Sequence, residues 1–289
     1  GHPMTRRERM TGQDLFFNYC LWAYEPVAPW QDKWRSANLL FHSFEHAGAD
    51  DGMFDLVERL RGTVGPSMTV WGVKWAGGRI GWEYYFYDYR RRERERSAAK
   101  VLRGMAPLVR STVRLNENHH YFMFSLDIDD ALVAGARSVD EIHMYIGNPG
   151  SDVSSGICYA VTPTGARLEN FYFFFDARRH REDILNKIAC SAQIDQGAVE
   201  LGEIYRPELR DCRTICLANK QRTDCIYFSG ITVDQLIFFL NWLDYPRSLC
   251  SLVERNRSRL DHLLYDVGFD YRMESDRLRI EKSGYYGIF

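Results

Sequence analysis

A strand, a short turn, an arginine and a second strand recur in this order along the chain. The pattern is clearest in three segments, GVKWAGGRIGWEYYFYD, CYAVTPTGARLENFYFFFD and DYRMESDRLRIEKSGYY. A hairpin of this kind buries too little apolar surface to be stable alone, so its copies must stack on one another. This repeat therefore constrains the fold more than any other feature of the sequence.

Alternation of apolar and polar residues predicts five such hairpins, joined by turns with the sequences AGGR, NENHH, TPTGA, QRT and ESD. Helical patterns over residues 94–109, 130–146, 181–192 and 233–264 separate them, the last as one helix or two. Residues 12–62 are predicted to be mostly helical. The predicted hairpins are Thr69–Trp75 with Ile80–Tyr89, Thr112–Leu115 with Tyr121–Ile128, Gly156–Thr162 with Leu168–Asp176, Thr214–Lys220 with Cys225–Ile231, and Val267–Met273 with Leu278–Tyr286.

Ten antiparallel strands with intervening helices can remove their exposed edges by closing into a barrel. We therefore predict an α+β fold, a ten-stranded antiparallel β-barrel of five ββα repeats with helices outside. Residues 12–289 form its single domain. The start Gly1-His2-Pro3-Met4 is typical of an expression-tag remnant before a natural methionine, and residues 1–11 are expected to be disordered.

The two faces of each strand can be assigned from the alternation. In a barrel wrapped by helices, the more apolar face points outwards and the other face lines the lumen. The outward set is Trp82, Tyr84, Phe86, Phe122, Phe124, Leu126, Ile128, Ile215, Leu217, Leu278 and Ile280. The inward set is Glu83, Tyr85, Tyr87, Tyr89, Tyr121, Met123, Ser125, Asp127, Lys220, Arg279, Glu281, Ser283 and Tyr285. The third hairpin is aromatic on both faces, and its inner face stays undecided. Side chains alone cannot fill so wide a barrel, so the lumen is predicted to hold a ligand.

The composition of the whole chain excludes several classes of protein. A net charge of −2 gives no basic field for nucleic acid. No run of about eighteen apolar residues is present, so no membrane-spanning helix is expected. The seven cysteines include no CxxC pair, which indicates free thiols in a reducing compartment. The expected location is the cytoplasm.

From about residue 12 to the end, this layout resembles the αββα (ABBA) prenyltransferase barrel, or PT barrel. Within that fold the chain is most similar to the peptide prenyltransferases of cyanobactin biosynthesis, which modify ribosomal peptide natural products (RiPPs). The local similarities are VGFDYRMESDRLRIE at 267–281, ARLENFYFFFD at 166–176, and LANK at 217–220. The resemblance implies a transferase that moves a dimethylallyl or geranyl group from its diphosphate to a peptide side chain, with Mg²⁺ as cofactor.

The chemistry of that reaction selects candidate residues. Ionisation of an allylic diphosphate leaves pyrophosphate, which cationic side chains hold, and a carbocation, which aromatic rings shield from water. A carboxylate accepts the proton that the acceptor loses. The diphosphate candidates are Lys74, Arg79, Lys220 and Arg279; the ring candidates are Tyr85, Tyr87, Tyr121, Tyr227 and Tyr285; and the candidate base is Glu83.

Two segments depart from the family pattern. The first strand, in PSMTVWGVKW, lacks an acidic residue, and the segment SLDIDD carries Asp127 and Asp129 where relatives tend to be basic. These departures indicate a shifted diphosphate site, a diphosphate site bridged by Mg²⁺, or acids that serve a cationic acceptor. An acidic pocket would suit an arginine side chain as acceptor, with Trp, Tyr and His as alternatives. Two other functions stay open: a small-molecule aromatic or indole prenyltransferase, and a non-catalytic peptide-binding barrel of the same fold. The pattern identifies no metal ligands.

Overall fold

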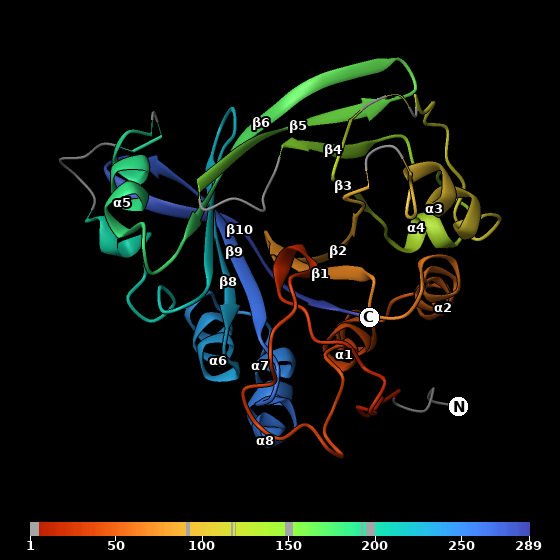
Figure 1. Ribbon diagram of the computed structural model, residues 1–289, viewed down its shortest axis with the longest axis horizontal. Coiled ribbons are helices and arrows are strands. Elements are labelled where there is room, and N and C mark those ends of the chain that lie inside the picture. Colours follow the sequence, from red (N-terminus) through yellow and green to blue (C-terminus); the bar gives the residue numbers. More distant parts are fainter. Residues whose placement is uncertain are drawn as a thin grey trace.

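Ten antiparallel strands form a closed barrel in which sequence neighbours pair, and β1 pairs with β10 (Figure 1). The computed structural model describes residues 6–90, 93–116, 118, 120–147, 153–191, 193–194 and 200–289. The strands are β1 (Thr69–Ala76), β2 (Arg79–Tyr87), β3 (Met123–Asp127), β4 (Ile142–Gly147), β5 (Val153–Thr162), β6 (Gly165–Asp176), β7 (Thr214–Asn219), β8 (Asp224–Ile231), β9 (Tyr265–Glu274) and β10 (Arg277–Ile288). The predicted fold class is confirmed.

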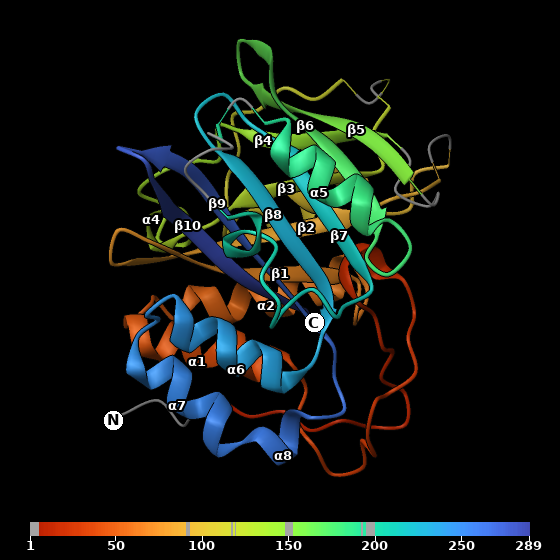
Figure 2. The same ribbon diagram turned by 90° about the vertical axis from the view of Figure 1, so that its left-hand side faces the viewer.

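Helices lie outside the barrel and cover much of its apolar outer face. Helices α1 and α2 pack on β1, α5 packs on β7, and α6 packs on β9 (Figures 1 and 2). The buried residues between the two layers form the main hydrophobic core, with Trp71, Phe124 and Phe228 fully buried. In the described part of the chain the α-helices are α1 (Ala37–Ala47), α2 (Gly52–Val64), α3 (Ala98–Met105), α4 (Asp130–Val133), α5 (Arg181–Ala189), α6 (Val233–Trp242), α7 (Arg247–Arg255) and α8 (Arg257–Leu260).

The second hairpin differs from its prediction. Residues 112–115 form no strand, because Thr112 N donates to Val139 O (2.9 Å) in a loop outside the barrel. The partner of β3 is β4, within a stretch that was predicted to be helical. Outward Ile142 and Met144 alternate there with inward His143 and Tyr145, which is the period of a strand. Of the predicted helix 130–146 only α4 forms. The predicted helix 181–192 ends at Ala189, and residue 192 lies outside the described residues.

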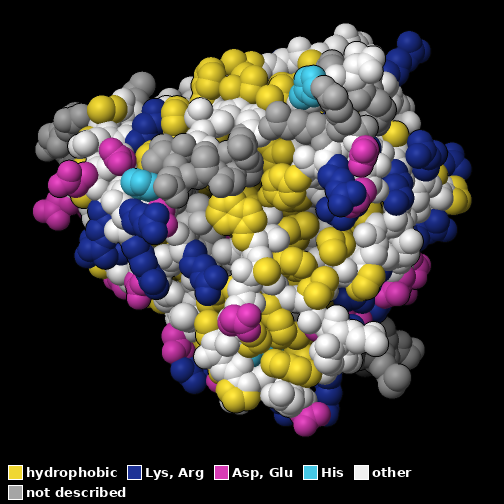
Figure 3. Space-filling view, viewed as in Figure 1, with side chains coloured by type: hydrophobic (Ala, Val, Ile, Leu, Met, Phe, Trp, Pro, Cys, Tyr) yellow, Lys and Arg dark blue, Asp and Glu magenta, His cyan; other side chains and the backbone are white. Residues whose placement is uncertain are grey.

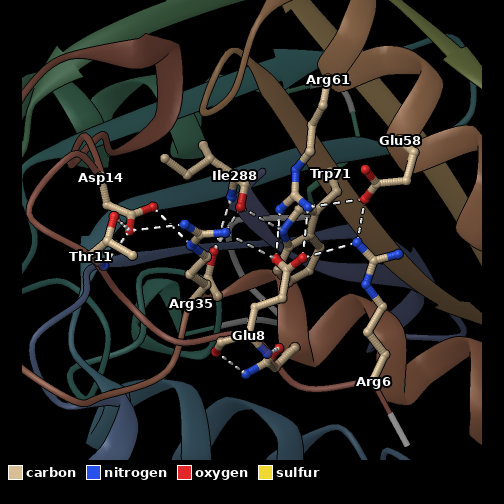
Figure 4. A network of polar contacts seen from close by, with 11 residues as sticks. Arg6, Glu8, Thr11, Asp14, Arg35, Glu58, Arg61, Trp71 and Ile288 are labelled. Atoms are coloured by element: carbon tan, nitrogen blue, oxygen red, sulfur yellow. Dashed lines mark hydrogen bonds and ion pairs between the residues drawn. The ribbon is translucent and has the colours of Figure 1, made fainter. Parts of the chain in front are cut away.

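The N-terminal part contains less helix than predicted, and residues 6–11 are ordered. Figure 4 shows how a network of ion pairs holds this segment against α2. Glu8 accepts two hydrogen bonds from Arg61 (2.7 and 2.8 Å), and Arg6 pairs with both Glu8 and Glu58. Although burial opposes the effect, Arg61 and Arg6 lower the pKa of Glu8 to about 2. The expected disorder of residues 6–11 is therefore wrong, and residues 1–5 lie outside the described residues.

A β-bulge in β10 decides which residues enter the lumen. The pairing of β10 with β9 shifts register between Ile280 and Ser283. Before the bulge, Ile280 points outwards as predicted. After it, Ser283 and Tyr285 point outwards to Tyr245, whereas Lys282 and Tyr286 point into the barrel. The prediction that Ser283 and Tyr285 line the lumen is wrong, because one extra residue inverts the alternation.

A similar inversion precedes β3. Tyr121 lies outside the barrel, where its hydroxyl accepts a hydrogen bond from Ala98 N (3.1 Å), and Phe122 packs on the inner side. Both were assigned to the opposite face, because the strand begins only at Met123 and the preceding backbone does not follow its alternation. The faces predicted for β2 and β7 are confirmed, since Trp82, Tyr84, Phe86, Ile215 and Leu217 belong to the outer core.

Candidate functional site

The N-terminal segment closes one end of the barrel. The 3₁₀ turn η1 (Tyr19–Leu21) inserts Tyr19 into the lumen, where its ring lies parallel to Tyr227 (6.1 Å between centroids) and edge-on to Tyr85 and Tyr87. This closed end faces the viewer in Figure 1, and Figure 3 shows hydrophobic side chains gathered over the middle of the same face. Access to the lumen is therefore from the other end, where the hairpin turns lie.

That open end holds a cavity of about 290 Å³, close to the lower limit of small-molecule sites, which span about 300–1,000 Å³. Four tyrosines, which we call the tyrosine wall, line its inner part: Tyr85, Tyr145, Tyr172 and Tyr227. Charged and polar side chains line the rest: Lys74, Glu83, Asp127, His143, Glu169, Asn170, Lys220, Gln221, Arg222 and Lys282. The cavity is therefore apolar and electron-rich inside and charged at its entrance.

Lys74 and Glu83 form a buried ion pair across β1 and β2. Glu83 is 3% exposed, and it also accepts hydrogen bonds from Tyr85 Oη (2.7 Å) and Ser125 Oγ (2.9 Å). His143 Nδ1 lies 3.9 Å from the same carboxylate. Burial would raise the pKa of Glu83, but Lys74 and His143 hold it well below its ordinary value. A carboxylate whose ionised form these partners stabilise is a weak base.

Two further lysines face the same cavity. Lys220 Nζ donates to both carboxylate oxygens of Asp270 (3.0 and 3.2 Å). Lys282, which the bulge turns inwards, has no hydrogen bond or ion pair with any described residue. The ammonium of Lys74 and burial together lower the pKa of Lys282. An unpaired cation held beside another cation is the arrangement that an anionic ligand would relieve.

Asp127 is the carboxylate of the cavity that has no hydrogen bond or ion pair with a described residue. It lies opposite Glu83 in the pairing of β2 with β3 and lines the cavity. Asp127 is exposed at the mouth of the cavity, but partial desolvation by the surrounding groups and the charge of Glu83 raise its pKa. Asp129 has a different role: it caps α4 by accepting from Leu132 N (3.1 Å), pairs with Arg137, and does not line the cavity.

Two glycines allow the lumen rings to approach the barrel backbone. A Cβ at Gly268 would lie 2.4 Å from Tyr227 Cδ1, and one at Gly72 would lie 2.7 Å from Tyr286 Cε1. Both contacts are shorter than real side chains allow. Tyr286 packs edge-on against Tyr85 with 5.8 Å between ring centroids. The positions of these rings therefore depend on the absence of a side chain at each glycine.

The structure brings together about half of the candidates from the sequence. Those in the cavity are Lys74, Glu83, Tyr85, Asp127, Lys220 and Tyr227. Tyr87 lies deeper, beside Tyr19. Arg79 and Arg279 are exposed at hairpin tips and do not line the cavity, and Tyr121 and Tyr285 lie outside the barrel. The residues that sequence reasoning missed are Tyr19, His143, Tyr145, Tyr172, Lys282 and Tyr286; the alternation in IHMYIG was the available signal for two of them.

One group of side chains at the open end has the spacing of metal ligands. Ligand atoms of Glu141, His143 and Glu169 lie within 4.8 Å of one another. Both glutamates already pair with Arg167, and Mg²⁺ prefers oxygen to the imidazole nitrogen. This group therefore does not fit a magnesium site.

Comparison with protein-family models gives no match, and comparison with curated proteins gives none either. In the described part of the chain, no helix combines the length and apolar character that crossing a membrane requires. What can be inferred about function therefore comes from the barrel and the chemistry of its cavity.

Proposed function

We propose that this protein is a peptide prenyltransferase, which transfers a dimethylallyl group from dimethylallyl diphosphate to a peptide side chain. The observation that carries the proposal is the unpaired Lys282, placed with Lys74 and Lys220 at the entrance of a cavity whose inner part is the tyrosine wall. A diphosphate joined to a short apolar chain has the same division into an anionic and an apolar part.

The lysines bind the leaving group. Ammonium groups form charge-assisted hydrogen bonds to phosphate oxygens, and these strengthen as the bond between C1 and the bridging oxygen breaks and charge moves to pyrophosphate. Lys282 is free to bind at once. Lys74 and Lys220 bind while keeping their carboxylate partners, Glu83 and Asp270.

The tyrosine wall stabilises the other product of ionisation. The allylic carbocation is attracted to the electron-rich ring faces and is kept from water by them. Tyr145 and Tyr172 lie 5.3 Å apart between centroids, and Tyr19 closes the lumen behind Tyr227. The small cavity favours the dimethylallyl group over geranyl.

The acceptor completes the reaction. Its nucleophilic atom forms a bond to C1 of the carbocation, and the proton that it loses passes to Asp127, whose carboxylate is unpaired and whose pKa is raised. This role suits Asp127 better than Glu83, which is surrounded by donors. The same carboxylate can first bind an arginine acceptor. Magnesium remains a prediction from the family resemblance, and no step here depends on it.

The proposal is tested by mass spectrometry of the purified protein with dimethylallyl diphosphate, with and without Mg²⁺. The acceptors are a panel of cyclic and linear peptides that contain Arg, Trp, Tyr, His or Ser, together with free indoles and phenols. We expect a gain of one isoprenyl unit on a peptide. A gain on the small aromatics alone would favour the small-molecule alternative, and no transfer to any acceptor would refute the proposed activity.

Two matched variants connect the activity to the cavity. Lys282→Met removes the unpaired lysine, whereas Arg279→Met removes a cation of the same hairpin that is 61% exposed and lies outside the cavity. We expect dimethylallyl diphosphate binding, measured by calorimetry, to weaken about 30-fold in the first, which corresponds to loss of one charge-assisted hydrogen bond of about 2 kcal/mol. Equal affinity in both variants would show that the donor binds elsewhere.

A further inference from the structure

Strand β6 extends beyond β7, which is its neighbour on one side. It pairs with β5 from Gly165 to Phe175, but its pairing with β7 begins only at Phe171. On the β7 side, residues 166–170 therefore have no strand partner among the described residues. Figure 2 shows the β5–β6 hairpin extending beyond the turn that joins β7 to β8.

This free edge borders the cavity. Glu169 and Asn170, at its inner end, line the cavity together with the lysines. The corresponding edge of β9, on the other side of the β7–β8 turn, is covered, because Met273 N donates to Gln193 O (3.3 Å). Of the two edges beside this turn, the one on β6 has no backbone partner among the residues that the structure describes.

An unpaired strand edge offers N–H and C=O groups at the spacing of a β-ladder, which is the way many proteins bind extended peptides. We propose that the peptide substrate binds here in extended form, as an additional strand on residues 166–170 of β6. This inference rests on the proposed function for the identity of the partner. Five residues of strand span about 16 Å, enough to lead a peptide from the hairpin tip to the cavity.

The geometry also gives the orientation of the peptide. Residues opposite one another on paired strands share a face. The peptide residue opposite Asn170 would share the inner face with Tyr172, so its side chain points into the cavity as the acceptor. A β-bulge at Glu169 inverts the alternation of β6, so Leu168, which pairs with Tyr159, lies on the outer face and is 49% exposed. The peptide residue opposite Leu168 would share that outer face. We therefore expect an apolar residue near the acceptor and little dependence on the side chains farther away.

Amide hydrogen exchange tests this mode of binding. The probes are linear heptapeptides, acetylated and amidated, with a central Arg, Trp or Tyr between alternating Thr and Val. We expect a saturating probe to slow exchange of edge amides within residues 166–170 by at least tenfold, and to leave the β9–β10 turn, residues 274–277, unchanged. The same peptides with alternate backbone nitrogens methylated lose donors but keep their side chains, and they should give no protection.

A matched pair of exposed leucines supplies the second test. Leu168→Asp should weaken binding of the probe about tenfold, whereas Leu15→Asp, which is equally exposed at the closed end, should not. Unchanged exchange at residues 166–170 during binding or prenylation, equal binding of the methylated peptides, or no probe binding would each overturn the docking mode. Protection without prenyl transfer would instead refute the enzyme while keeping the peptide site, so the two failures can be told apart.

Discussion

Replacing Lys282 by Met should stabilise the ligand-free protein while weakening its binding of an isoprenyl diphosphate. Lys282 is held beside Lys74 without a carboxylate partner of its own, and the lowered pKa shows that its charged form is disfavoured in the folded protein. Removing the charge relieves this repulsion and keeps a side chain of similar length. We expect a gain of about 1 kcal/mol in the free energy of unfolding, within the range of other charge-optimising substitutions.

The neighbouring lysine should respond in the opposite direction. Lys74→Met removes the ammonium that neutralises Glu83, a carboxylate that is 3% exposed, and leaves that charge buried. Breaking a buried pair in this way costs about 3 kcal/mol. With an m-value near 3 kcal/mol/M, the urea midpoint would fall by about 1 M. Arg257→Met, which breaks a pair whose side chains are 52% and 61% exposed, should change stability by less than about 0.5 kcal/mol.

Both lysine variants are measured by urea unfolding followed by tryptophan fluorescence at pH 7, with calorimetric binding of dimethylallyl diphosphate alongside. The account requires opposite changes in stability and weaker binding in both. If Lys282→Met proved as destabilising as Lys74→Met, Lys282 would have a structural partner, and the reasoning that makes it the ligand-binding cation would fail.

Three further predictions concern the closed end and the rings. Burial raises the pKa of Asp266 to about 8 against hydrogen bonds that lower it, so the folded protein keeps a proton that the unfolded chain loses above about pH 4. Between about pH 4 and pH 8 the free energy of unfolding of the wild type should therefore fall, relative to that of Asp266→Asn, by up to about 1.4 kcal/mol per pH unit. Urea midpoints of both proteins at pH 5 and pH 8 measure this difference. Parallel pH profiles would contradict the raised pKa of Asp266. Tyr19→Ala should lengthen the lumen and shift the donor preference from dimethylallyl diphosphate towards geranyl diphosphate. The measurement is the ratio of kcat/KM for the two donors. An unchanged ratio would mean that Tyr19 does not limit the length of the donor pocket. Gly268→Ala should displace the Tyr227 ring, cost about 1–3 kcal/mol and lower kcat. Gly62→Ala, at an exposed position of α2 with open space around it, should leave kcat unchanged. Normal activity in Gly268→Ala would show that the position of this ring is unimportant.

The barrel could be predicted because the sequence signals that specify its hairpins are local. Each hairpin carries its own alternation and its own turn, so the strands of four hairpins were identified from the sequence, and closure followed from the need to remove edges. The fourth strand was missed because Ile142–Gly147 follows a segment with helical spacing, and a six-residue strand does not outweigh it.

The site was harder to predict, because a single extra residue in a strand decides which of its side chains face the lumen. One bulge before Ser283 exchanges Tyr285 for Tyr286 and brings Lys282 into the cavity. Nothing in the local sequence of β10 specifies that extra residue, since the bulge arises from its pairing with β9. The insertion of Tyr19 is likewise a tertiary contact between the N-terminal segment and rings more than sixty residues away, which no local pattern encodes.

The most direct test of the donor site is a crystal structure with dimethylallyl thiolodiphosphate, an analogue whose carbon–sulfur bond resists ionisation. The account predicts diphosphate oxygens about 2.7–2.9 Å from Nζ of Lys282 and Lys220, with Lys74 adjacent and the dimethylallyl group against the tyrosine wall. An empty cavity at saturating analogue, or a diphosphate bound away from these lysines, would contradict the proposal that this barrel is a prenyltransferase.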